Sequence, residues 1–326
     1  MPCIEAANVL RHDCVGPGMY EMEISAPAIA AIAAPGQFVH AHVRPVLRDW
    51  QQPSAPAQPL LRRPFSISGA DSRISGSITF LYKVRGTGTQ LLANVRPGDR
   101  LDVMGPLGKG FTLPEPPSRP QSQSQPESQP ALRPKSQPES QPALRPLRQP
   151  PAQSPHDVLV GGGLGIAPLV FLAHTLARSG RGVTVLYGAN TAGDMQSTLR
   201  RLQVSGAGSI QVFTTTLDGS AGLTGIVTDL LTAEPSAAAL EDVDYIYTCG
   251  PEPMMAAVEQ FALARHIPGE MSLETALACG MGACLGCARR LRTNPGASPV
   301  YARVCKDGPV FSFGQVELNP APCGEE

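Results

Sequence analysis

The sequence predicts a multi-domain protein of the β plus α/β class, with an N-terminal β-barrel, a doubly wound α/β domain and a small C-terminal module. Three observations predict this. Short strand patterns separated by Pro and Gly fill residues 1–113. Apolar runs alternate with amphipathic stretches over residues 156–270. Four of the eight cysteines then lie within 27 residues of the last segment, 271–326. Residues 114–155 form a linker between the first two domains.

The barrel is predicted from the period of its strands. In residues 77–84, large apolar side chains alternate with mostly smaller or polar ones, as in a half-buried strand. Further short strands are expected at 36–43, 63–68 and 100–104, with turn signals between them. Repeated short strands of this kind are typical of a small barrel.

The linker differs in composition from the rest of the chain. Thirteen of the 34 prolines fall in residues 114–155, and one 11-residue sequence occurs at 124–134 and again at 136–146. Such a segment buries too little apolar surface to offset its ordering entropy, so we expect a disordered or polyproline-like spacer that leaves the two domains loosely placed. A docking motif is the alternative interpretation.

The α/β domain is predicted from short apolar runs suited to buried parallel strands. The expected strands are 158–160, 183–187, 210–214 and 245–247. Amphipathic stretches between and after them predict helices at 169–177, 224–231 and 253–264. This alternation is typical of a doubly wound sheet with helices on both faces.

Composition limits the partners of the chain. With 26 basic and 27 acidic side chains the formal net charge is −1, so no overall field attracts nucleic acid or an anionic membrane. The longest aliphatic run, 28–34, is far short of the ~20 residues that a bilayer helix needs. The N-terminus lacks the pattern of a secretory signal, so a cytoplasmic location is expected.

The most specific motif is a set of four cysteines. Cys279, Cys284, Cys287 and Cys305 reproduce the C-x4-C-x2-C…C spacing of plant-type [2Fe-2S] proteins. Glycines between them allow the backbone to bend closely and direct its N–H groups toward sulfur. A structural zinc site is the alternative, although zinc is usually bound by two separated pairs and the fourth cysteine here stands alone.

A second set of residues predicts a flavin site on the barrel. Arginine offers a fork of donors to a pyrophosphate, and a helix N-terminus also favours phosphate. Each motif alone is also compatible with an ordinary strand or turn. The candidate FAD-binding residues are Arg63, Pro64, Phe65, Ser66, Leu81, Tyr82, Lys83, Gly88 and Thr89, the last two opening an expected helix at 90–95.

A third set predicts a dinucleotide site on the α/β domain. A glycine-rich turn joins its first strand to the next helix, where close backbone approach and the helix dipole suit a pyrophosphate. Cys249 and Gly250 end the last expected strand at the same sheet edge, although a buried structural thiol also explains Cys249. The candidate dinucleotide-binding residues are Gly162, Gly163, Gly165, Cys249 and Gly250.

No side chains suggest acid–base or hydrolytic catalysis. His40 and His42 share one face of the strand at 36–43, but without a third ligand nearby we interpret them as ordinary strand residues. We therefore expect no catalytic residue, because bound cofactors would perform the redox chemistry.

The order of these motifs, ending in the V-C-K-D-G-P-V-F segment at 304–311, resembles the electron-transfer subunits of dihydroorotate dehydrogenase B (NAD+), within the ferredoxin reductase superfamily. The resemblance implies FAD on the barrel, a [2Fe-2S] cluster on the four cysteines, and NAD on the α/β domain. It implies an oxidoreductase subunit that accepts electrons from an FMN-containing catalytic subunit and passes them through the cluster and FAD to NAD+, in de novo pyrimidine (UMP) biosynthesis. Two copies of each subunit would form a heterotetramer.

Two other hypotheses stay open on the sequence alone. Flavin and iron–sulfur subunits of sulfide dehydrogenase, of NADH-dependent ferredoxin:NADP reductase and of some hydrogenases would use the same cofactors with another partner. A zinc-stabilised scaffold without enzymatic activity would use the cysteines differently. The residue after the second strand of the α/β domain, Asn190, does not decide between NAD and NADP.

Overall fold

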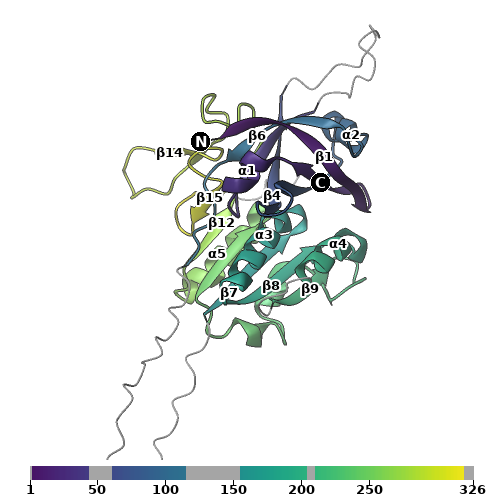
Figure 1. Cartoon of the computed structure of the whole chain (residues 1–326). Coiled ribbons are helices and arrows are strands. Elements are labelled where there is room, and N and C mark those ends of the chain that lie inside the picture. Colours follow the sequence, from purple (N-terminus) through teal and green to yellow (C-terminus); the bar gives the residue numbers. More distant parts are fainter. Residues whose placement is uncertain (1, 44–60, 115–154, 204–209, 319–326) are drawn as a thin grey trace, which may run out of the picture.

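The computed structural model describes residues 2–43, 61–114, 155–203 and 210–318. Except for its two end residues, the predicted linker lies outside this part of the chain. The predicted fold class is confirmed: a closed barrel, a mostly parallel sheet with helices, and a cysteine-rich module beside both (Figure 1).

Six antiparallel strands close the barrel in the order β1-β2-β5-β4-β3-β6, with β6 paired to β1. The alternation predicted in residues 77–84 is present, because Ile78 and Phe80 are completely buried in the barrel core. Of the four predicted strands, β4 and β6 are longer than expected and β3 and β5 shorter, and two further strands, β1 and β2, were not predicted. Their bounds are β1 Cys3–Gly16, β2 Met19–Ser25, β3 Phe38–His42, β4 Arg63–Asp71, β5 Ser77–Lys83 and β6 Arg100–Leu107.

Two short helices accompany the barrel. Helix α1 (Pro27–Ile32) begins with a proline, whose fixed φ and missing N–H are tolerated in the first turn, and it buries Ile29. Helix α2 (Thr87–Ala93) begins three residues before the expected position at residue 90. The hydroxyl of Thr89 explains the early start, because it accepts hydrogen bonds from the N–H groups of Arg85 (2.8 Å) and Gly86 (3.2 Å).

The second sheet has the order β10-β9-β8-β7-β11-β12-β15 and is parallel except for β15. Taken in chain order, its five main strands lie 3-2-1-4-5, the doubly wound arrangement in which ligands bind where the order reverses, here between β7 and β11. The bounds are β7 His156–Gly162, β8 Gly182–Ala189, β9 Ile210–Thr216, β10 Leu223–Thr224, β11 Tyr245–Cys249, β12 Gly269–Ser272 and β15 Val310–Ser312.

Two of the three expected helices are present, extended at one or both ends. They are α3 (Ile166–Arg178) and α5 (Glu252–Ala264), and an unpredicted helix, α4 (Ala192–Gln203), lies between β8 and β9. The predicted helix at 224–231 is wrong. Gly225 has a φ of 142°, outside the helical region, and only a 3-10 turn, η2 (Val227–Leu231), follows it. Two further 3-10 turns are η1 (Gly163–Gly165) and η3 (Ala237–Leu240).

The cysteine-rich module is built into the other two parts rather than appended to them. It contains one hairpin, β13 (Ala288–Arg290) with β14 (Tyr301–Arg303), before its chain returns to the sheet as β15. One hydrophobic core joins all three parts and includes Phe38 and Met104 of the barrel, Met255 and Met271 of the α/β domain, and Val304 and Phe311 of the module.

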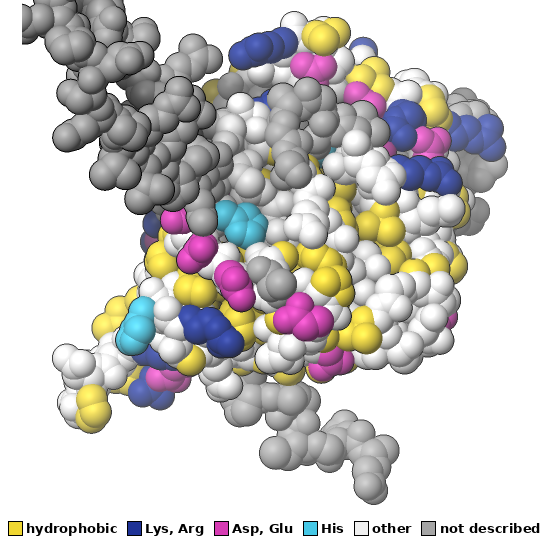
Figure 2. Space-filling view, turned by 90° about the horizontal axis from the view of Figure 1, so that it is seen from below, with side chains coloured by type: hydrophobic (Ala, Val, Ile, Leu, Met, Phe, Trp, Pro, Cys, Tyr) yellow, Lys and Arg dark blue, Asp and Glu magenta, His cyan; other side chains and the backbone are white. Residues whose placement is uncertain are grey.

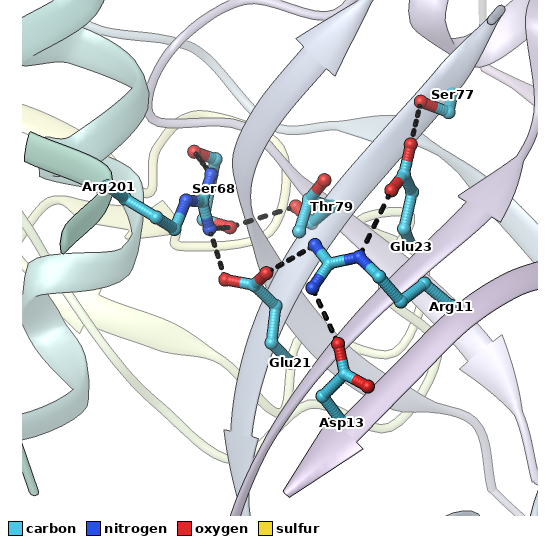
Figure 3. Close-up of polar contacts among 8 residues, drawn as sticks. All are labelled: Arg11, Asp13, Glu21, Glu23, Ser68, Ser77, Thr79 and Arg201. Atoms are coloured by element: carbon cyan, nitrogen blue, oxygen red, sulfur yellow. Dashed lines mark hydrogen bonds and ion pairs between the residues drawn. The ribbon is translucent and has the colours of Figure 1, made fainter. Parts of the chain in front are cut away.

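The barrel and the α/β domain are in direct contact, against the expectation of loose placement. Phe171 of α3 is part of the barrel core, and Arg201 of α4 is hydrogen-bonded to Glu21 and Ser68 of the barrel (Figure 3). These contacts fix how the two domains face each other.

The surface agrees with a balanced charge. In the view from below, acidic, basic and hydrophobic side chains of the described residues are interspersed (Figure 2). Among the described helices, none combines the length and apolar character that crossing a membrane requires.

A buried ion pair lies at the start of the sheet. Arg181 donates from Nη2 to Asp157 Oδ1 at 2.8 Å and from Nε to Oδ2, and the side chains are 5% and 0% exposed. Burial raises the pKa of Asp157, while the hydrogen bonds and charge of Arg181 oppose that rise. The carboxylate therefore depends on Arg181 for its charged form.

We expect Arg181→Ala to lower the free energy of unfolding by about 3–5 kcal/mol at pH 7, because it leaves Asp157 charged and unpaired. The loss should shrink as the pH falls toward 5. The folded protein then binds a proton on Asp157 that the unfolded chain, with its lower pKa, does not bind. Urea denaturation measures both effects. The exposed Arg178→Ala is the matched control, and equal losses at the two positions would contradict the role of burial.

Candidate cofactor sites

Two cavities lie side by side where the barrel meets the α/β domain. The first, of about 280 Å³, opens on the barrel, and the second, of about 840 Å³, lies along the carboxyl edge of the parallel strands. Four residues line both cavities: Lys83, Arg85, Leu164 and Glu274. Ligands in the two cavities would therefore have these four residues as common neighbours.

The first cavity gathers most of the residues predicted to bind a flavin. Seven of the nine line it, from β4, β5 and α2: Pro64, Phe65, Ser66, Leu81, Tyr82, Lys83 and Thr89. Its opposite wall comes from the start of α3, from residues 272–275 and from the cysteine-rich module, which contributes Val304 and Pro309. The cavity is thus enclosed by all three parts of the protein.

Arg63 and Gly88, the other two candidates, lie beside the first cavity and against each other. A side chain at Gly88 would begin 3.0 Å from Arg63 Nε, so any larger residue would push the guanidinium from its present position. The guanidinium lies at the first turn of α2, an end of a helix that favours an anion, and its Nη1 donates to the carbonyl oxygen of Leu61 at 2.7 Å. This cradle fits a pyrophosphate such as that of FAD.

Tyr82 is fixed by a hydrogen bond on the side away from solvent. Its hydroxyl lies 2.8 Å from His12 Nε2, and His12 Nδ1 lies 2.8 Å from the carbonyl oxygen of Val95. Since that carbonyl can only accept, we assign the imidazole proton to Nδ1, and Tyr82 then donates to Nε2. Burial raises the pKa of Tyr82 above its usual value, so the phenol stays neutral.

Two backbone turns meet at the second cavity, one after β7 and one after β11. A side chain at Gly165 would begin 2.4 Å from the carbonyl oxygen of Cys249, and one at Gly162 would begin 2.7 Å from Met254 Sδ. Gly163 has a φ of 56°. Glycine is therefore needed here for the two turns to pack together, a reason that the motif alone did not reveal.

Four of the five residues predicted to bind a dinucleotide line the second cavity: Gly162, Gly163, Gly165 and Gly250. Cys249 does not line it. Its thiol is completely buried, and burial raises its pKa well above the usual value. A neutral buried thiol of this kind agrees with the structural alternative considered from the sequence.

Glu274 occupies the junction of the two cavities. Its side chain is exposed to the cavities, yet the protein packed around it raises the pKa of its carboxyl group, while the charge of Arg85 acts in the opposite direction. Sequence reasoning missed both residues, because neither belongs to a ligand-binding motif. The nearest signal was their position, two residues after the end of β5 for Arg85 and two residues after the end of β12 for Glu274.

Two contacts connect the four predicted cluster cysteines, one between two sulfurs and one from a backbone N–H to a sulfur. Cys287 Sγ and Cys305 Sγ lie 3.3 Å apart, and the N–H of Cys284 points at Cys279 Sγ over 3.5 Å. A [2Fe-2S] cluster would be held by four such cysteine thiolates. Among the described residues, no three His, Cys, Asp or Glu side chains converge closely enough to hold a single metal ion.

The loop around Cys279 is shaped to hold a negative sulfur. Backbone N–H groups of Met281 and Cys284 lower the pKa of the Cys279 thiol to about 6, whereas burial raises that of Cys305 to about 12. Gly280, with a φ of 70°, allows the bend that aims these N–H groups. The donor set and the loop therefore fit a thiolate-bound cluster.

His40 is packed under this loop. Its ring is fully buried, and a side chain at Gly280 would begin 2.5 Å from His40 Nδ1. Burial lowers the pKa of His40 to about 4, so the imidazole is neutral. His40, which the sequence analysis interpreted as an ordinary strand residue, thus packs against the cysteine loop at Gly280.

Comparison with known proteins identifies two segments. Residues 274–317 match the iron–sulfur cluster binding domain of dihydroorotate dehydrogenase B, and residues 159–260 match the oxidoreductase NAD-binding domain. The first segment contains all four predicted cluster cysteines.

Curated relatives match almost the full chain. An electron transfer subunit of dihydroorotate dehydrogenase B (NAD(+)) from Geobacillus sp. (strain WCH70) is 33% identical over 96% of this chain and 98% of its own length. One from Desulforamulus reducens is 34% identical over 95% and 97%.

Among solved structures, an NADH-dependent reduced ferredoxin-NADP oxidoreductase has a TM-score of 0.69 at 23% identity, covering 96% of this chain and 90% of its own. A ferredoxin reductase of carbazole 1,9a-dioxygenase has a TM-score of 0.54 at 19% identity, covering 82% and 67%. These likenesses concern the fold.

We expect Cys284→Ser to remove the iron signal while FAD stays bound, because the thiol belongs to the cysteine loop and not to the wall of either cavity. Iron analysis and flavin release on denaturation measure the two contents. Cys14→Ser, which changes an exposed thiol on β1, should alter neither. Loss of FAD together with iron would show that the two sites do not form independently.

We expect Arg63→Ala to weaken FAD binding by roughly 10- to 100-fold, since it removes charge-assisted hydrogen bonds to a pyrophosphate. Titration of the flavin-free protein with FAD measures the change. Arg62→Ala is the matched control, because Arg62 is bonded to Asp102 at 2.6 Å on the outside of the barrel. If both variants bound FAD equally well, Arg63 would not be the phosphate ligand.

Proposed function

This chain belongs to the family of electron transfer subunits of dihydroorotate dehydrogenase B (NAD(+)), and from that premise we propose its function. It is the oxidoreductase subunit that takes electrons from an FMN-containing catalytic subunit oxidising dihydroorotate and delivers them to NAD+, in the synthesis of UMP. The partner, the FMN and a heterotetramer of two plus two subunits are inferences from the family. So is a cytoplasmic location.

One observation carries the proposal: the flavin cavity lies between the cysteine-rich module and the dinucleotide cavity. Val304 and Pro309 of the module form part of its wall, and Lys83 of the barrel and Leu164 of the α/β domain form wall that it shares with the dinucleotide cavity. Flavin exchanges electron pairs with nicotinamide and single electrons with iron–sulfur clusters, so a flavin held in this cavity can connect the two.

The chain's own residues bind and orient the groups. Arg63 and the first turn of α2 would hold the FAD pyrophosphate, and the cavity residues of β4 and β5 would contact the flavin. The turn after β7, at the start of α3, receives the pyrophosphate of NAD. Cys279, Cys284, Cys287 and Cys305 hold the [2Fe-2S] cluster. No side chain is assigned a catalytic proton transfer.

The proposed division of the chain follows from these roles. Residues 1–113 bind FAD, 156–270 bind NAD, and 271–326 carry the cluster, with residues 114–155 as a linker. The last division falls inside β12, so the cluster module and the nucleotide sheet share a strand.

We expect the purified chain, loaded with FAD and iron, to reduce an artificial electron acceptor with NADH and to leave dihydroorotate unchanged. Adding a dihydroorotate-oxidising FMN protein from the same cell should produce NADH from NAD+ when dihydroorotate is supplied. Absorbance at the NADH band follows both reactions.

Cys284→Ser is the matched control for this coupling. It should lose NAD+ reduction from dihydroorotate and keep the reduction of FAD by NADH, because only the first path needs the cluster. Co-purification with a different oxidoreductase, and no coupling to the FMN protein, would contradict the proposed partner. Zinc without iron in a colourless protein would contradict the redox function altogether.

A further inference from the structure

Helix α4 connects the dinucleotide cavity with the side of the barrel. Asp194 lies in its first turn and Arg201 in its last. Arg201 follows Asp194 by seven positions, about two helical turns, so both side chains project from the same face of the helix. Each is bonded to the barrel, and the helix is therefore attached at both ends.

Arg201 makes the more extensive attachment. Its Nη1 donates to Glu21 Oε2 at 2.9 Å and to Ser68 Oγ at 2.8 Å, and its Nη2 donates to the backbone oxygen of Ser68 at 2.8 Å (Figure 3). The planar guanidinium thus bonds two barrel strands, β2 and β4, at once. Lysine could not reproduce this fork, because its ammonium is a single point charge.

The acceptor on the barrel is itself held in place. Glu21 is only 6% exposed in its side chain, and its second oxygen accepts from Arg11 at 2.5 Å. Arg11 is bonded in turn to Asp13 at 2.7 Å (Figure 3). The carboxylate cannot turn away without breaking a second ion pair.

Asp194 makes the attachment at the other end. It pairs with Lys83 Nζ at 3.3 Å, and Asp194 also lines the dinucleotide cavity. Lys83 lies on β5 and lines both cavities. The ion pair at the first turn of α4 therefore includes a residue, Lys83, that forms part of the wall of both cavities.

Two glycines on the barrel leave room for the helix. A side chain at Gly69 would begin 2.9 Å from Arg201 Nη2, and one at Gly16 would begin 2.8 Å from the carbonyl oxygen of Gly193. Neither glycine has a positive φ, so the close approach of α4 and not the local backbone requires them. Gly16 thus leaves room for the first turn of α4, and Gly69 leaves room for Arg201 in its last turn.

We propose that Arg201 and Asp194 are positioning residues that hold the dinucleotide cavity at a fixed distance from the flavin cavity. The proposal rests on the proposed function. The chain passes from barrel to α/β domain through residues 115–154, so the spacing of the cavities depends on non-covalent contacts such as these. Transfer of an electron pair needs reacting atoms within ~3.5 Å, and displacement by ~1 Å can slow it by up to 100-fold.

The test compares Arg201→Ala with Arg200→Ala, its exposed neighbour on the same helix. Both proteins are loaded with FAD and iron to the same content. At saturating NADH we expect Arg201→Ala to reduce FAD roughly tenfold more slowly in stopped flow, while its Kd for NADH changes less than about twofold. Arg200→Ala should match the wild type, and Arg201→Lys should recover part of the rate.

Gly69→Val provides a second variant that keeps every charge. Its side chain would displace the Arg201 guanidinium from Ser68, so it should slow FAD reduction like Arg201→Ala. A wild-type rate in both Arg201→Ala and Gly69→Val would overturn the proposal. So would a rate loss that saturating NADH restores, because that would indicate a binding role.

A readout without turnover separates this inference from the proposed function. Hydrogen–deuterium exchange in α4 should increase in Arg201→Ala and Gly69→Val but not in Arg200→Ala, while β11 stays protected. If the wild type were not reduced by NADH, the proposed function would fail, and the exchange result alone would decide on the positioning role. Unchanged exchange in α4 would then overturn it.

Discussion

The arrangement of the cavities depends on a single buried carboxylate. Glu21 faces Arg11 of its own barrel on one side and Arg201 of the α/β domain on the other. A charge with so little exposure is stable only when ion pairs and hydrogen bonds replace its water. The barrel therefore reaches its most favourable electrostatic state when α4 is docked, and docking brings the flavin and dinucleotide cavities together.

The cysteine-rich module depends on its neighbours for a core. Its hairpin buries few residues, and its largest apolar side chains pack into the cluster shared with Phe38 and Met271. Arg292 and Arg289 add ion pairs to α5 at Glu259 and Glu252, each at 2.6 Å. Because one core serves three parts and includes Cys287 and Cys305, the cysteine-rich module is anchored to both the barrel and the α/β domain.

The sequence predicted what rests on local pattern. Alternation revealed β5, apolar runs revealed β7, β8, β9 and β11, and cysteine spacing revealed the cysteine-rich module. It did not reveal α4, whose Asp194 and Arg201 have partners up to 180 residues away, or Glu274, which belongs to no motif. The helix expected at 224–231 failed because Gly225 takes a φ outside the helical region. The periodicity of a sequence shows neither the long-range partners of a side chain nor the backbone angle of a single residue.

The fixed ends of the proline-rich segment have a consequence for changes in its length. Thr112 is bonded to Glu270 of β12 at 2.7 and 2.8 Å, and the carbonyl oxygen of Pro155 accepts from Gly182 of β8 at 2.9 Å. With both ends tied to one sheet, added length between them costs only the slowly growing entropy of a larger loop. A change in the number of repeats between these two ends therefore leaves the contacts described around the cavities in place.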